Sequence, residues 1–104
     1  MFGGQNMKQM MKQAQKMQQK IQEEQKRLES ETMDAQSGGG VVKVTVNGKK
    51  EIVSLTIDKE VVDPNDTEML QDLITAAVNE AMHKMDEYVN QKMEEIAGPL
   101  AGML

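Results

Sequence analysis

Cysteine and tryptophan are absent from this chain of 104 residues. Without cysteine, disulfide bonds and thiolate metal sites are excluded. One phenylalanine and one tyrosine are the only aromatic residues, so the core must be built from aliphatic side chains and from the 11 methionines. Methionine fills irregular gaps but specifies packing weakly. A small core of this kind favours association with a second copy of the chain.

Long apolar runs are also missing. The N-terminal stretch MFGGQN lacks the continuous apolar segment of a signal peptide. No segment approaches the roughly 20 apolar residues that a transmembrane helix needs. The length allows one domain. We therefore expect a cytoplasmic protein of a single domain, residues 1–104, with no membrane partner.

Motifs typical of enzymes and metal sites are lacking as well. The sequence has no phosphate-binding loop, no dinucleotide-binding glycine pattern, no nucleophile elbow and no histidine-rich metal spacing. Its one histidine, His83, falls among polar residues of a helical segment, where a surface position is expected. Adjacent carboxylates such as Glu94 and Glu95 diverge by about 100° on a helix and suit a solvated face. The sequence therefore predicts no catalysis and no bound metal, cofactor or small-molecule substrate.

Acidic residues are missing from one segment of a chain that is acidic as a whole. The chain has 17 acidic and 12 basic residues and a net charge of −5, yet residues 7–22 contain no acid. Residues 1–30 hold 6 basic and 3 acidic side chains, or +3, and residues 31–104 hold 6 basic and 14 acidic side chains, or −8. Positive charge is therefore concentrated at the N-terminus.

Helical periodicity runs from about residue 6 to residue 29. Apolar side chains recur on one face at spacings of three, four or seven residues: Met7, Met10, Ala14, Met17, Ile21 and Leu28. The opposite face carries six basic residues: Lys8, Lys12, Lys16, Lys20, Lys26 and Arg27. The first four lysines form a row about 18 Å long, at a rise of 1.5 Å per residue. Such a row can neutralise phosphates of duplex DNA, but a solubilising helix face explains the pattern as well.

The segment from residue 31 to residue 58 predicts a small β-sheet. In VVKVTVNGKKEIVSLTI, two β-branched runs flank Asn47-Gly48, the preferred loop of a two-residue hairpin. That loop would place Val42 opposite Val53. Alternation then puts six apolar side chains on one face, which we expect in the core or a dimer interface: Val42, Val44, Val46, Val53, Leu55 and Ile57. The preceding ETMDAQS is either an edge strand or a linker, and the glycines at 38–40 predict a turn.

A second long helix is expected from residue 66 to residue 96. The turn and N-cap chemistry of residues 63–66 precedes it, and Gly98-Pro99 is expected to end it, which leaves residues 97–104 as a flexible tail. Its apolar arc spans roughly 200°, more than one contact surface requires. The part of this arc that we expect in the core or a dimer interface is Leu70, Leu73, Ile74, Ala77, Val78 and Ala81.

Three stretches of the sequence together resemble one known family. MFGGQNMKQMMKQAQKMQQKIQEEQKRLE, GGGVVKVTVNGKKEIVSLTID and EVVDPNDTEMLQDLITAAVNEAMHKMDEY are similar, in this order, to the YbaB/EbfC family of bacterial nucleoid-associated proteins. The resemblance implies an α+β fold of order α-β-β-β-α, with a small antiparallel sheet flanked by two long helices, and a tweezer-like homodimer. It also implies binding of duplex DNA, a role in chromosome organisation and gene regulation in the nucleoid, and no enzymatic activity.

Two functions are compatible with these observations. In the first, a homodimer binds duplex DNA through the basic helix face: Lys8, Lys12, Lys16, Lys20, Lys26 and Arg27. In the second, the chain is a protein interaction module, and the methionine-rich face of the N-terminal helix receives a partner helix.

Overall fold

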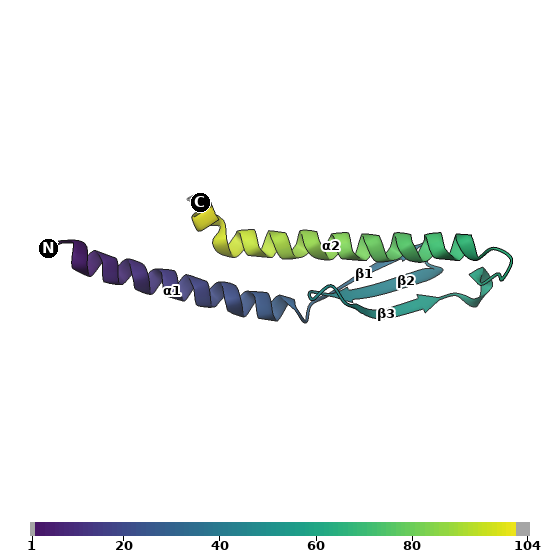
Figure 1. Ribbon diagram of the computed structural model, residues 1–104, viewed down its shortest axis with the longest axis horizontal. Helices are drawn as coiled ribbons and strands as arrows, with labels where there is room; N and C mark the ends of the chain where they lie inside the picture. Colours follow the sequence, from purple (N-terminus) through teal and green to yellow (C-terminus); the bar gives the residue numbers. More distant parts are fainter. Residues whose placement is uncertain (1, 102–104) are drawn as a thin grey trace.

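The structure, a computed structural model, describes the backbone of residues 2–101. The elements follow in the order α1 (Phe2–Leu28), β1 (Thr32–Ser37), β2 (Val42–Asn47), β3 (Ile52–Ile57), the short 3-10 helix η1 (Lys59–Val61) and α2 (Thr67–Ala101) (Figure 1). Two long helices thus precede and follow a three-stranded antiparallel sheet along the chain, and the predicted α+β fold is confirmed. The segment before the glycines is a strand rather than a linker.

The single chain is markedly elongated. It measures 79 × 21 × 16 Å and has a radius of gyration of 21.0 Å, where a compact chain of this length has about 13 Å. Helices α1 and α2 run antiparallel, and α1 extends well beyond the end of α2 (Figure 1). We call the sheet with α2 the body, and α1 the arm.

The sheet has the strand order β1-β2-β3, but the predicted two-residue hairpin is wrong. Val42 pairs with Ile57 rather than with Val53, and the loop between β2 and β3 spans residues 48–51. The side chain of Asn47 organises this loop, because its Oδ1 accepts hydrogen bonds from the backbone N–H groups of residues 49 and 51 over 2.9 and 3.0 Å. Lys50, rather than a glycine, takes the left-handed conformation, with φ 64°.

Gly48 serves a different purpose: it lets the hairpin loop touch the end of α1. A Cβ atom at this position would lie 1.9 Å from the carbonyl oxygen of Leu28. The N–H of Gly48 donates a hydrogen bond to the carbonyl oxygen of Glu31 over 3.1 Å, just before β1 begins. Leu28 itself is buried. The loop therefore fixes the joint at which the arm leaves the body.

Helix α2 covers one face of β1 and β2. Ala77 and Ala81 are fully buried, and their small side chains let the helix approach the sheet closely. The buried core consists of Ala35, Val42, Val44, Val46, Ala77, Ala81 and Met85. Partly buried side chains around it include Ile57, Leu70, Leu73, Ile74 and Val78. These packed residues hold the body together.

The same face of β3 is left uncovered in the single chain. Helix α2 packs on β1 and β2 and hardly touches β3. Leu55, which pairs with the buried Val44, is 43% exposed, and Val53 is 56% exposed. A β-bulge shifts the register near the loop and places Ile52 opposite Val46. An apolar strip of the sheet thus faces solvent beside the core.

Both helices are longer than the sequence predicts. The arm begins at Phe2 rather than near residue 6. Helix α2 is capped by Asp66, whose carboxylate accepts from the N–H of Met69 over 3.2 Å, and it passes the expected stop at Gly98-Pro99 to end at Ala101. A proline there removes a single ladder hydrogen bond, and the last turn bends away from α1 (Figure 1). Of the predicted tail, residues 102–104 lie outside the described residues.

Candidate nucleic-acid interface

The basic face of the arm is a solvent-exposed row of lysines. From residue 5 to residue 20 the helix contains no glycine, proline or β-branched residue, and its glutamines, lysines and methionines are good helix formers. Five lysines of the predicted site are exposed on it: Lys8, Lys12, Lys16, Lys20 and Lys26. Within residues 2–101, the ion pairs that form do not include any of these five. Their charge is available to an external partner.

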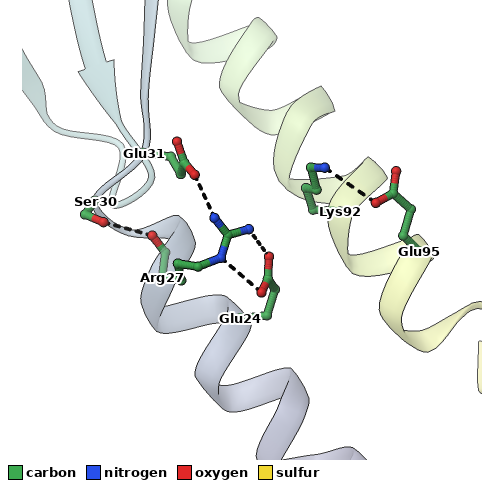
Figure 2. A network of polar contacts seen from close by, with 6 residues as sticks. All are labelled: Glu24, Arg27, Ser30, Glu31, Lys92 and Glu95. Carbon is green, nitrogen blue, oxygen red and sulfur yellow. Dashed lines mark hydrogen bonds and ion pairs between the residues drawn. The ribbon is translucent and has the colours of Figure 1, made fainter.

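Three of the six lysines of the body differ from these, because each of the three lies beside a carboxylate. Lys50 lies 3.2 Å from Asp86, and Lys84 donates a hydrogen bond to the backbone carbonyl of Asp34 over 3.2 Å. Lys92, on the side of α2 near the arm, lies 3.5 Å from Glu95 (Figure 2). Within residues 2–101, all five lysines of the arm but only three of the six in the body, Lys43, Lys49 and Lys59, form no ion pair, so positive charge without a partner is concentrated on the arm.

Arg27 was grouped with the lysines by sequence, but it sits in a network at the joint (Figure 2). Its guanidinium donates to both carboxylate oxygens of Glu24, with Nε 3.1 Å from Oε2, and its Nη1 donates to Glu31 over 2.9 Å. The hydrogen bonds between Arg27 and Glu24 raise the pKa of the arginine and lower the pKa of the carboxyl. Because Glu31 lies beyond the end of α1, Arg27 braces the arm against the start of β1.

A signal for this different role exists in the sequence. Glu24 precedes Arg27 by three residues and Glu31 follows it by four, and both spacings bring side chains together on a helix. No lysine between residues 8 and 16 has an acid at such a spacing. Acidic residues at helical spacing therefore predict an ion-paired role for Arg27 and free charge for the first lysines of the row.

The opposite, apolar face of the arm is covered along only part of its length. Leu28 is buried, and Met17 and Ile21 are partly buried where α1 faces α2. A cleft of about 500 Å³ lies between the two helices, lined in part by Met17 and Ile96. Towards the N-terminus the cover ends, and Met7 and Met10 are 63% and 67% exposed. The outer half of the arm therefore offers a basic face and a bare methionine face.

Metal-binding clusters and membrane-spanning helices are absent from residues 2–101. No group of three or more histidine, cysteine, aspartate or glutamate side chains there is arranged to hold a metal ion. None of the helices in this range is long and apolar enough to span a bilayer. His83 is exposed, as expected, with its Nε2 3.1 Å from a carboxylate oxygen of Glu87.

Comparisons with known proteins identify the family of this chain. The sequence profile of the YbaB/EbfC DNA-binding family matches residues 3–100. A nucleoid-associated protein of Ruminiclostridium cellulolyticum is 53% identical over 102 residues, which cover 98% of this chain and 88% of the relative. One from Staphylococcus carnosus is 57% identical over 93 residues, or 89% of each chain. A solved structure, that of an uncharacterised protein from Helicobacter pylori, matches with a TM-score of 0.62 and 26% identity over 88% of this chain and 98% of that one. The chain belongs to the YbaB/EbfC DNA-binding family.

Proposed function

We propose that this chain is a non-enzymatic, nucleoid-associated protein of the bacterial cytoplasm that binds duplex DNA through the basic face of its arm. The observation that carries the proposal is the row of exposed lysines without carboxylate partners on an otherwise acidic chain. The names of the relatives, which are nucleoid-associated proteins, support it. Its role is to organise the chromosome and thereby influence gene regulation.

Phosphate binding follows from the geometry of the row. Lys8 to Lys20 span about 18 Å of helix, and each lysine that neutralises a phosphate releases counterions from the duplex. Glutamines between the lysines can add hydrogen bonds to phosphate oxygens. Lys26 extends the row, whereas Arg27 contributes less because two carboxylates already share its charge. The acidic body repels the duplex and confines contact to the arm.

We also propose that the DNA-binding form is a homodimer with β3 in its interface. Ile52, Val53 and Leu55 leave an apolar strip in water beside the core, and Val62 and Met69 are also exposed. Covering apolar surface is worth about 25 cal/mol per Å². A twofold axis would then present two arms in the tweezer-like form, and two arms on one duplex raise the avidity without new contacts.

The test is fluorescence anisotropy with a labelled random-sequence duplex at about 50 mM and about 200 mM salt. The variant Lys12→Glu with Lys16→Glu reverses two charges on the arm. Its matched control, Lys43→Glu with Lys59→Glu, makes the same change in net charge at two exposed positions of the body. We expect the arm variant to bind roughly 100-fold more weakly and the control to change by less than about threefold.

Two results would contradict the proposal. Equal losses in both variants would mean that net charge alone, and not its position on the arm, governs binding. No binding of the wild type at the lower salt concentration, with the fold intact by circular dichroism, would exclude duplex DNA and favour a protein partner.

A further inference from the structure

The apolar face of the arm, which we call the stripe, extends towards the N-terminus beyond the point where α2 stops covering it. The cleft between the two helices is lined by Met17 and Lys20 of α1 and by Glu95 and Ile96 of α2. Because the helices are antiparallel, each residue further along α2 lies opposite a residue one position earlier on α1. If this alignment continues to Ala101, where the described part of α2 ends, the opposite point on the arm is about residue 14.

Beyond that point the described chain offers the stripe no cover. Met7, Met10 and Met11, which we call the methionine patch, are 63%, 67% and 61% exposed, more than the other exposed large apolar side chains. The last turn of α2 bends away from the arm (Figure 1). The patch is continuous with the covered part of the stripe, and it lies on the half of the arm that carries the first lysines.

We propose that the methionine patch pairs with the same patch of a chain in a neighbouring dimer when both dimers are bound to one duplex. This inference rests on the proposed binding of DNA. Three side chains per copy supply far less than the roughly 800 Å² per partner of a stable interface, so free molecules do not associate through the patch. Copies held side by side on a duplex have an effective concentration of roughly millimolar, at which a weak contact becomes populated.

The charge of the arm makes this contact depend on DNA. Because residues 7–22 contain no acid, two free arms repel each other. Phosphates that neutralise Lys8 and Lys12 remove this repulsion. Met10 lies about 160° around the helix from both lysines and Met7 lies at least about 100° from them, so these two side chains stay available while DNA is bound, whereas Met11 borders Lys8. Methionine adapts to irregular surfaces, which suits an isologous contact between two identical helices.

The first experiment compares two duplexes by anisotropy. At 3.4 Å per base pair, the 79 Å length of one chain corresponds to about 23 base pairs, so duplexes of about 24 and about 96 base pairs are chosen to hold one dimer and several dimers. The wild type is expected to bind the long duplex cooperatively, with a midpoint at least about threefold lower than on the short one. The variant Met7→Gln, Met10→Gln, Met11→Gln should match the wild type on the short duplex and lose this gain. Glutamine is unbranched and a good helix former, so the arm is expected to remain helical.

A matched control addresses the chain's own C-terminus as the occupant of the patch. Met103→Gln with Leu104→Gln removes the large apolar side chains there, and we expect it to retain the cooperativity of the wild type. Loss of cooperativity in this control, with the methionine-patch variant unchanged, would overturn pairing between copies.

The second experiment uses the absence of cysteine. Met10→Cys introduces the only thiol of the chain, and a short bismaleimide should join two arms on the long duplex but neither in free protein nor on the short duplex. Equal cross-linking on both duplexes would place the pairing within one dimer and overturn the inference. So would equal cooperativity of the wild type and the methionine-patch variant. If the wild type fails to bind even the short duplex, the proposed function falls as well; if it binds the short duplex and gains nothing on the long one, only this inference falls.

Discussion

The two long helices of this chain use charge in opposite ways. On α2, lysines lie beside glutamates three or four residues away, as in the pairs Lys84–Glu80 and Lys92–Glu95. On the outer half of α1, lysines recur every four residues with no acid between them. The net charge of −5 therefore says little about what the molecule binds. What matters is where charge lacks a partner, because paired charges largely cancel beyond a short distance.

The helices also differ in how they are stabilised. Helix α2 is anchored by alanines that fit tightly against the sheet, whereas the outer half of α1 has exposed methionines and no packing partner in the described chain. Its helical conformation there depends on intrinsic propensity and on continuity with the packed half. The body thus supplies stability, and the arm supplies an adaptable surface.

The largest effect is expected from placing a charge on the uncovered strip of the body. Leu55→Asp would bury a carboxylate in the proposed interface, so we expect the molecular mass from light scattering to fall to that of a monomer. Ser54→Asp makes the same change in charge at the neighbouring exposed position, on the other side of the strand, and should leave the mass unchanged. A dimer that persists in the Leu55 variant would mean that β3 is not in the interface, and would leave the body with an unexplained apolar strip.

A smaller effect is expected at the joint between the two regions. Gly48→Ala sets a Cβ against the backbone of Leu28, which cannot move aside by changing a rotamer. We expect a loss of about 3 kcal/mol in the free energy of unfolding, measured in urea at a fixed protein concentration. The control Gly98→Ala has no atom within 4 Å of the added Cβ and lies in a helix, so it should stabilise by up to about 1 kcal/mol. Equal stabilities of the two variants would show that the joint is not closely packed.

The smallest effect is expected from the network of Arg27, Glu24 and Glu31 at the joint. The pKa of Glu24 is held below its ordinary value of 4.5 by Arg27, so this carboxylate stabilises the fold above that pH and loses its contribution as the pH falls through the lowered pKa. Glu24→Gln should therefore lower the melting temperature slightly at neutral pH, and the difference from the wild type should shrink below pH 4.5. Glu23→Gln, the neighbouring position outside the network, is the control. A difference that is constant with pH would argue against the ion pair as its cause.

Sequence periodicity predicted the elements and the faces of this fold but not the register of its hairpin. Pairing Val42 with Val53 or with Ile57 places the same side chains on the same face, since the two registers differ by an even number of residues. Alternation therefore cannot distinguish them, and Asn47-Gly48 favoured the shorter loop. In the structure that glycine is needed for contact with Leu28, a residue distant in sequence, which no local turn rule takes into account.

The candidate site was predictable to a similar extent. The lysine row follows from spacing alone, because on a regular helix the residue number fixes the direction in which each side chain projects. The exposure of Met7 and Met10 does not, since it depends on where α2 ends alongside the arm. The same limit applies to β3, whose apolar residues belong to the core pattern but receive no cover from α2 in one chain.

A small rotation of the arm at the joint near Gly48 produces a large displacement at its N-terminal tip. A helix of 27 residues is about 40 Å long, so a rotation of about 10° at the joint moves its tip by about 7 Å. That displacement equals about two base-pair steps along a duplex. Small differences in how tightly the hairpin loop holds the end of α1 would therefore change which phosphates the outermost lysines reach, while the body remains as it is.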